Sequence, residues 1–305
     1  MTSSPKLQLL DSTGFADYRL LDSGNGRKLE RFGRVTVDRP EPQALWRPRL
    51  EPSVWAKADA TFAGEDDEEA GKWRRGADVP ETWPMRLHEV TLLGRLSAFR
   101  HLGLFPEQLP HWDWMRGLIA DVRATDPEAK PRVLNLFAYT GAASLLAAAA
   151  GAEVTHVDAS KKAIAWAKEN QAASKLGDAP IRWILDDARK FAAREARRGK
   201  RYHVILVDPP KFGRGPSGEV WELFEHLPAH LADCVALLEP GRSAIVLTAY
   251  AIRASALSIG QLMQEAIGGR TGRHDCGELA IREEAGGRAV PTSLYARWVS
   301  HDLVR

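Results

Sequence analysis

The feature that most constrains the fold of this chain is an alternation of apolar, strand-like runs with segments of helical length, which begins near Pro131. Such an alternation predicts a parallel sheet whose strands are connected by crossover helices. The expected strands span residues 133–137, 154–158, 181–185, 203–207 and 243–248, and the expected helices span 142–150, 161–175, 188–198, 220–238 and 254–267. Two further runs, 277–282 and 293–299, predict a terminal antiparallel hairpin. We therefore expect an α/β fold with a Rossmann-like, seven-stranded, mostly parallel sheet.

The first part of the chain has a different pattern. Short strand-like runs at residues 18–21, 28–32 and 35–37 surround a turn at residues 23–26 that contains Gly-Asn-Gly. Such runs around this kind of turn predict a small β unit. A chain of 305 residues is long enough to form two hydrophobic cores. We therefore expect a small β-rich domain at residues 1–90 and the α/β domain at residues 91–305.

Composition and termini limit where the protein works. No apolar stretch reaches the ~20 residues that cross a bilayer, and the N-terminus lacks the pattern of a signal peptide. The two cysteines, Cys234 and Cys276, are far apart and lack metal-ligand spacing. We therefore expect a cytoplasmic protein with no membrane partner and no metal site.

Three candidate ligand-binding segments stand where successive strands end. In open α/β sheets, ligands bind beyond the carboxyl ends of the strands. Gly141 follows the first strand and opens an alanine-rich helix, where a missing side chain lets a ligand approach the backbone. Asp158 ends the second strand, where a carboxylate accepts from both hydroxyls of a ribose. The third strand ends in Asp186-Asp187, an acceptor for an adenine amino group.

Each of these segments also has a purely structural interpretation. Gly141 fits a plain strand-to-helix turn, Asp158 fits a cap for the helix near Ser160, and one of the two later acids fits a helix N-cap. Their repetition at three successive strand ends favours a ligand site. The first loop lacks G-x-G-x-x-G, which disfavours NAD and favours a nucleoside ligand without a pyrophosphate.

The fourth expected strand ends in Asp208-Pro209-Pro210-Lys211. Consecutive prolines remove two backbone donors and restrict φ, so the carbonyl oxygens and the Asp208 carboxylate form a rigid group of acceptors. Acceptors without donors suit an amino group or a cationic centre. The alternative is that the prolines only terminate the strand, but the neighbouring acid at the ligand edge favours a catalytic loop.

Together these segments resemble the class I S-adenosylmethionine-dependent methyltransferases, and within them the branch that contains bacterial large-subunit ribosomal RNA methyltransferases. The resemblance covers about residues 95–305 and rests on residues 134–141, 157–160, 186–188 and 208–212, together with the upstream run 103–108. It implies the cofactor S-adenosyl-L-methionine, with Phe137, Tyr139 and Gly141 shaping the methionine pocket. Asp158 with Ala159 would hold the ribose, Asp187 with Ala188 the adenine, and Gln108 would lie near the cofactor. Asp208 and the carbonyl of Pro209 would face the substrate.

The resemblance leaves the methylated atom open. Members of this branch that methylate C5 of cytosine use a cysteine after the fifth strand to attack the ring. Tyr250 aligns with that position, which argues against carbon methylation. Nitrogen-methylating relatives often carry an aromatic residue directly after the two prolines, whereas here Lys211 precedes Phe212.

An RNA substrate would have to bind through local basic patches, because the net charge is only +2. Arginines interleaved with tryptophans, as in single-stranded nucleic-acid surfaces, occur in the N-terminal part at Arg27, Lys28, Arg31, Arg34, Arg39, Trp46, Arg47, Arg49, Trp73, Arg74 and Arg75. The alternative is that the tryptophans form a core and the arginines its solvated face. A second basic cluster at residues 189–201 is typical of a solvated helix surface. The loop 213–218, which contains Arg214, is expected to be flexible and to close over a flipped nucleotide.

The leading hypothesis is therefore a methyltransferase that acts on a base of ribosomal RNA. One alternative is a methyltransferase for a small molecule or a protein, which the near-neutral net charge keeps open. Another is a nucleoside-binding α/β module without catalysis, but such a module would have no need of Asp208-Pro209-Pro210.

Overall fold

The computed structural model describes residues 6–63, 71–98, 100–250 and 252–303. The chain divides into two compact units. The α/β unit comprises Met1–Leu10, His111–Glu278 and Ser293–Arg305, and the β unit comprises Asp11–Pro110 and Leu279–Thr292. This division is discontinuous and falls later than the boundary expected at residue 90. It is discontinuous because the tip of the C-terminal hairpin bonds to the N-terminal strands, where Glu284 N donates to Leu20 O at 2.9 Å.

The sheet of the α/β unit has eight strands and is mixed, in the order β1-β16-β17-β15-β12-β9-β10-β11. The strands are β1 (Lys6–Ser12), β9 (Arg132–Leu136), β10 (Glu153–Asp158), β11 (Ile181–Leu185), β12 (Val204–Val207), β15 (Ala244–Tyr250), β16 (Gly272–Arg282) and β17 (Ala289–Ser300). The expected count of seven strands is wrong, because β1 joins the sheet at its edge beside β16. Because β1 and β16 lie near opposite ends of the sequence, no local pattern indicates that they pair.

The five strands β15, β12, β9, β10 and β11 run parallel, as predicted. The first four are mostly buried runs, typical of strands covered on both faces, and all four residues of β12 are buried. The fifth, β11, lies at the edge of the sheet and has no fully buried residue. The chain passes from β9 outward to β10 and β11, and then returns to the other side of β9 for β12 and β15. The strand order therefore reverses between β9 and β12, which is where open α/β sheets bind their ligands.

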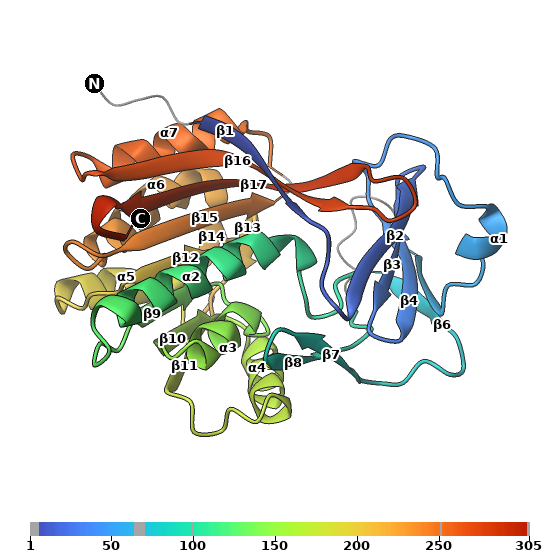
Figure 1. The fold of residues 1–305 in the computed structure, drawn as a ribbon, viewed down its shortest axis with the longest axis horizontal. Helices are drawn as coiled ribbons and strands as arrows, with labels where there is room; N and C mark the ends of the chain where they lie inside the picture. Colours follow the sequence, from blue (N-terminus) through green and yellow to red (C-terminus); the bar gives the residue numbers. More distant parts are fainter. Residues whose placement is uncertain (1–5, 64–70, 99, 251, 304–305) are drawn as a thin grey trace. The chain divides into compact units, whose positions relative to one another are not determined.

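Helices cover both faces of this sheet (Figure 1). One layer contains α2 (Leu109–Thr125), α3 (Ala142–Ala149) and α4 (Lys161–Ala173), and the other contains α5 (Ala188–Arg197), α6 (Leu223–Ala236) and α7 (Ala256–Ile267), with η2 (His301–Leu303) near the C-terminus. The second layer packs on the inner strands through a core that includes Leu136, Val207, Leu231, Leu247 and Met263. The helix expected from residue 220 begins only at Leu223, because Val220–Glu222 forms strand β14, which pairs with β13 (Phe212–Arg214).

The β unit contains a five-stranded sheet in the order β2-β3-β4-β5-β6 and a separate hairpin, β7-β8. Its elements are β2 (Tyr18–Gly24), β3 (Arg27–Phe32), β4 (Val35–Pro40), α1 (Pro52–Trp55), β5 (Ala60–Ala63), β6 (Lys72–Arg75), β7 (Trp83–Leu87), β8 (Val90–Gly94) and η1 (Pro106–Gln108). The predicted small β unit and its turn are confirmed: Asn25 and Gly26, with φ of 52° and 72°, turn the chain from β2 into β3. Within the described ranges of both units, no helix is long and apolar enough to cross a membrane.

Candidate active site

The loop between β9 and α3 has an unusual backbone. Phe137, Tyr139 and Gly141 all have positive φ, at 56°, 51° and 84°. Residues with side chains rarely adopt this region, and such strain persists where the surrounding structure enforces it, often at ligand sites. Here Asn170 of α4 donates from Nδ2 to Thr140 O at 2.9 Å. The loop is therefore held in one shape at the edge of the sheet.

Gly141 also has a structural role, beside the ligand contact expected from the sequence, which stays a prediction. A Cβ at this position would lie 3.1 Å from Cβ of Ala167 in α4. The missing side chain thus permits both the left-handed turn and the close packing of α4 against the start of α3.

Asp158 ties two strand-end loops together. Its Oδ2 accepts from Tyr139 N at 2.8 Å, and its Oδ1 accepts from Ser160 N at 2.7 Å. Burial raises the pKa of this carboxyl, and the two backbone hydrogen bonds oppose that rise. The cap of α4 is supplied instead by Ser160, whose Oγ accepts from Ala163 N. Because each carboxylate oxygen has two lone pairs, Asp158 keeps the capacity to accept further bonds.

The acids after β11 both make structural contacts. Asp187 caps α5, accepting at Oδ1 from Lys190 N at 2.9 Å, as the structural interpretation of this pair anticipated. Asp186 accepts from Asp187 N at 2.9 Å and pairs through Oδ2 with Arg194. Ala188 is buried at the start of α5, and Ala159 is half-buried after β10. The strand-end edge thus carries three carboxylates, those of Asp158, Asp186 and Asp187.

A buried polar layer, which the sequence analysis missed, lies beneath the β9–α3 loop. Asn135 of β9 donates from Nδ2 to Ser144 Oγ at 3.0 Å, and Ser144 Oγ contacts His156 Nδ1 at 3.0 Å. Burial lowers the pKa of His156 to about 3, so this ring is neutral. The sequence signal for this layer is a polar side chain within each of two otherwise apolar strands.

The Asp208 loop lies beside the β9–α3 loop. Val207, the last residue of β12, is in register with Leu136 of β9 and Leu247 of β15. Asp208 is half-buried, Pro209 is buried, and Pro210 and Lys211 are exposed. The expected set of acceptors is reduced by one, because Pro210 O accepts from Trp221 Nε1 at 2.7 Å.

The segment expected to be a flexible loop forms a β-hairpin. Phe212 pairs with Glu222, Gly213 with Trp221, and Arg214 with Val220. Directly opposed residues share a face, so Phe212 and Arg214 lie on the face opposite to that of Trp221. Phe212 is 53% exposed.

Glu219 stabilises the turn of this hairpin. Its Oε2 accepts from Ser217 N at 2.9 Å, and its Oε1 accepts from Lys190 Nζ at 2.6 Å. These contacts lower the pKa of Glu219 to about 2.

Tyr250 is the last residue of β15 and therefore ends at the same edge. The two cysteines of the chain are elsewhere. Cys234 is buried within α6, where burial raises its pKa, and Cys276 is buried within β16. Within the described residues, both cysteine thiols are therefore buried, and neither directly follows β15 in the chain.

With this geometry in place, comparison with known proteins defines the family. A segment of 131 residues is 37% identical to ribosomal RNA large subunit methyltransferase K/L of Shewanella frigidimarina, covering 41% of this chain and 18% of that protein. Residues 109–229 match a family described as conserved hypothetical protein 95. Over 98% of this chain and 97% of the other, the fold and sequence match a crystal structure of a SAM-dependent methyltransferase from Agrobacterium tumefaciens, with 51% identity and a TM-score of 0.90. This chain belongs to the S-adenosylmethionine-dependent methyltransferases.

More distant structures share the fold of this methyltransferase. The structure of SMU.776 with bound SAH has a TM-score of 0.72 at 18% identity and covers 93% of this chain and 75% of that one. By contrast, the methyltransferase spans under a fifth of the length of the curated relative from Shewanella.

Gln108 of this methyltransferase lies in η1 of the β unit and is buried beside Glu107, whose pKa is raised by burial. Its place near the cofactor stays a prediction.

The basic surface of the methyltransferase is smaller than the sequence suggested. Lys28 and Arg39 are buried beside Glu30, to which Arg39 Nη2 donates at 2.9 Å, and Arg27 pairs with Asp38 at 2.6 Å. The exposed members of the N-terminal basic set are Arg31, Arg34, Arg47, Arg49, Arg74 and Arg75.

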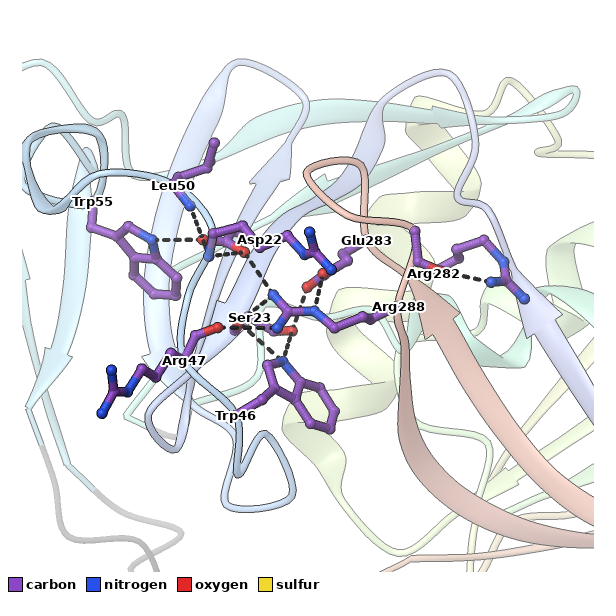
Figure 2. A network of polar contacts seen from close by, with 11 residues as sticks. Asp22, Ser23, Trp46, Arg47, Leu50, Trp55, Arg282, Glu283 and Arg288 are labelled. Atoms are coloured by element: carbon purple, nitrogen blue, oxygen red, sulfur yellow. Dashed lines mark hydrogen bonds and ion pairs between the residues drawn. The ribbon is translucent and has the colours of Figure 1, made fainter.

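Two tryptophans of the N-terminal part, Trp46 and Trp55, donate hydrogen bonds within the β unit. Trp46 Nε1 donates to Ser23 O at 3.1 Å, and Trp55 Nε1 donates to Asp22 Oδ2 at 3.1 Å (Figure 2). The guanidinium of Arg288 lies over the Trp46 ring, 5.4 Å from its centroid. This arrangement agrees with the alternative in which the tryptophans serve the small unit's own packing.

Proposed function

We propose that this methyltransferase transfers a methyl group from S-adenosyl-L-methionine to a base of ribosomal RNA. The observation that carries the proposal is the meeting, at the reversal of strand order, of a strained loop, the anchored Asp158 carboxylate and the Asp208 loop. A ribosomal RNA substrate would place the reaction in the cytoplasm.

The residues at this edge fit the proposed cofactor. The carboxylates of Asp158, Asp186 and Asp187 would repel a pyrophosphate, whereas ribose hydroxyls and an adenine amino group donate hydrogen bonds to such groups. Asp158 would hold the ribose, with Ala159 beside it, and Asp187 with Ala188 would border the adenine. Phe137, Tyr139 and Gly141 would form the methionine end of the pocket, and the family resemblance adds Gln108 as a cofactor-binding residue.

The chain's own contribution to methyl transfer would be alignment. The bound cofactor supplies an activated methyl group, and correct positioning of the two reactants can supply ~7–11 kcal/mol of the barrier. The Asp208 carboxylate and Pro209 carbonyl would accept hydrogen bonds from the substrate and orient its acceptor atom. Pro210 would keep this backbone rigid, and Lys211 would stand at the border with the RNA.

Support for an RNA substrate comes from the name of the curated relative and from the exposed face of the β13–β14 hairpin. Arg214 on this face would hold a phosphate beside the flipped target base. The exposed arginines of the β unit, among them Arg31, Arg34, Arg47 and Arg49, would bind phosphates of the RNA backbone.

Radiolabelled methyl transfer onto ribosomal RNA from a strain that lacks this gene, followed by nucleoside analysis, tests the proposal. The wild-type protein is expected to label one nucleoside of that RNA. Label in protein or small molecules, with none in RNA, would contradict the RNA substrate.

Arg214→Ala is expected to reduce transfer at least tenfold while the affinity for S-adenosylhomocysteine stays within twofold, since a charged phosphate contact is worth ~1.5–3 kcal/mol. Arg270→Ala, at an exposed arginine between α7 and β16, is the matched control and should change neither quantity. Equal loss of transfer and cofactor affinity in Arg214→Ala would refute its role in holding RNA.

A further inference from the structure

Trp221 of β14 contacts both loops of the proposed site. Its side chain is 2% exposed, and its Nε1 donates to Pro210 O at 2.7 Å. Its ring centroid lies 5.0 Å from that of Phe137 in the β9–α3 loop and 5.5 Å from that of His230 in α6. One buried side chain thus joins the cofactor-binding loop to the Asp208 loop.

The hydrogen bond from Trp221 determines how the catalytic backbone is oriented. Two consecutive prolines leave little freedom in φ, so holding the carbonyl of Pro210 restricts the peptide plane before it as well. Because this bond occupies the Pro210 carbonyl, the Pro209 carbonyl and the Asp208 carboxylate are the groups proposed to accept from a substrate. Gly213, which pairs with Trp221, lets strand β13 pack closely against Pro210, because a Cβ at this position would lie 3.3 Å from Pro210 Cγ.

The ring of Trp221 has a second role at the cofactor side. Phe137 has a left-handed backbone and needs its side chain to be held in place. His230 packs edge-on against both rings, with its ring centroid 5.7 Å from that of Phe137 and 5.5 Å from that of Trp221. Burial lowers the pKa of His230 to about 4, so the cluster of Phe137, Trp221 and His230 is uncharged at neutral pH.

We propose that Trp221 is a positioning residue that couples the cofactor-binding loop to the catalytic loop through its contacts with Phe137 and Pro210. This inference rests on the proposed function of the same site. Trp221 does not touch the reacting atoms; it acts through the two residues that it holds.

Trp221→Phe removes the hydrogen bond and part of the buried indole, because phenylalanine keeps an aromatic ring but has no donor and a smaller volume. The turnover number for methyl transfer is expected to fall about tenfold, the equivalent of one hydrogen bond, while the dissociation constant of S-adenosylhomocysteine changes less than twofold. The matched control is Trp298→Phe, since Trp298 of β17 is equally buried and its Nε1 has no hydrogen-bond partner among the described residues. The control should change neither value. An unchanged turnover number in Trp221→Phe would overturn the proposal.

A second measurement needs no substrate. In a ¹H–¹⁵N spectrum, the indole signals of Trp221 and Trp298 are assigned by their loss in the two phenylalanine variants. Addition of S-adenosylhomocysteine is expected to shift the Trp221 signal and to leave the Trp298 signal in place. If Trp221→Phe does not fold, Phe137→Leu identifies the Trp221 signal instead, because loss of the ring contact should shift that indole. The response of the same signal in the wild-type protein to S-adenosylhomocysteine then tests the coupling.

A wild-type protein that labels no RNA would refute the proposed substrate but not the coupling, which the spectra test separately. Absence of any indole shift on ligand addition would refute the coupling.

Discussion

Replacing Asp158 with asparagine would test the anchor of the cofactor-binding loop. The carboxylate accepts from Tyr139 N and Ser160 N at 2.8 and 2.7 Å, one bond to each oxygen. Asparagine keeps the shape but offers one oxygen and one amino group, so one of these backbone donors would face another donor. A hydrogen bond to a charged group is worth ~1.5–3 kcal/mol. The variant would also have one oxygen fewer to accept from the ribose.

Since 1.4 kcal/mol corresponds to a factor of ten, the dissociation constant of S-adenosylhomocysteine should rise about 10- to 100-fold, as measured by calorimetry. Glu153→Gln is the matched control, because Glu153 is an exposed acid at the other end of the same strand, β10. The control should bind within twofold of wild type. If Asp158→Asn also bound within twofold, Asp158 would not hold the ribose.

Three further variants test stability in urea or thermal unfolding. Gly141→Ala should lower the free energy of unfolding by about 1–2 kcal/mol, because alanine is strained at φ of 84° and would crowd Ala167; unchanged stability would show that the loop relaxes. His156 has a pKa of about 3 in the folded protein and ~6.5 when unfolded, so the unfolded chain takes up the proton first and stability falls as pH drops below about 6.5. In His156→Gln, the free energy of unfolding should fall less steeply with decreasing pH, by ~1 kcal/mol per pH unit between pH 6 and pH 4.5. Equal slopes for the variant and the wild type would contradict a buried, neutral His156 ring. Asp22→Asn should destabilise the β unit by ~1.5–3 kcal/mol, because buried Asp22 accepts from Leu50 N and Trp55 Nε1, while Arg288 keeps its ion pair with Glu283; an unchanged unfolding midpoint would show that these hydrogen bonds do not stabilise the unit.

The ends of the parallel strands could be located from the sequence because local rules govern them. A buried parallel strand is a short apolar run, and the residue after it lies at the ligand edge whatever the rest of the fold does. Asp158, Asp187 and Asp208 were found in this way, and all three lie at the ends of the strands expected. The N-terminal hairpin was equally local, since Asn25 and Gly26 favour its turn.

Elements whose partners are distant in the chain could not be found from local patterns. Strand β1 joins a sheet strand from the far end of the sequence, and the segment after Asp208 becomes a hairpin only because residues 220–222 pair with it. Trp221 was therefore read as part of a helix, and its bond to Pro210 was missed.

Local patterns in the sequence thus identified the edge of the site and the family that the chain resembles, but not which charged side chains are exposed to solvent. Lys28 and Arg39 count as basic residues in any composition, yet the pairing of β3 with β4 places Arg39 beside Glu30, away from solvent. Only the tertiary structure decided this. Whether a charge faces water or a buried partner depends on strand pairing and on which face of the sheet is covered, and both are set by contacts between residues distant in the chain.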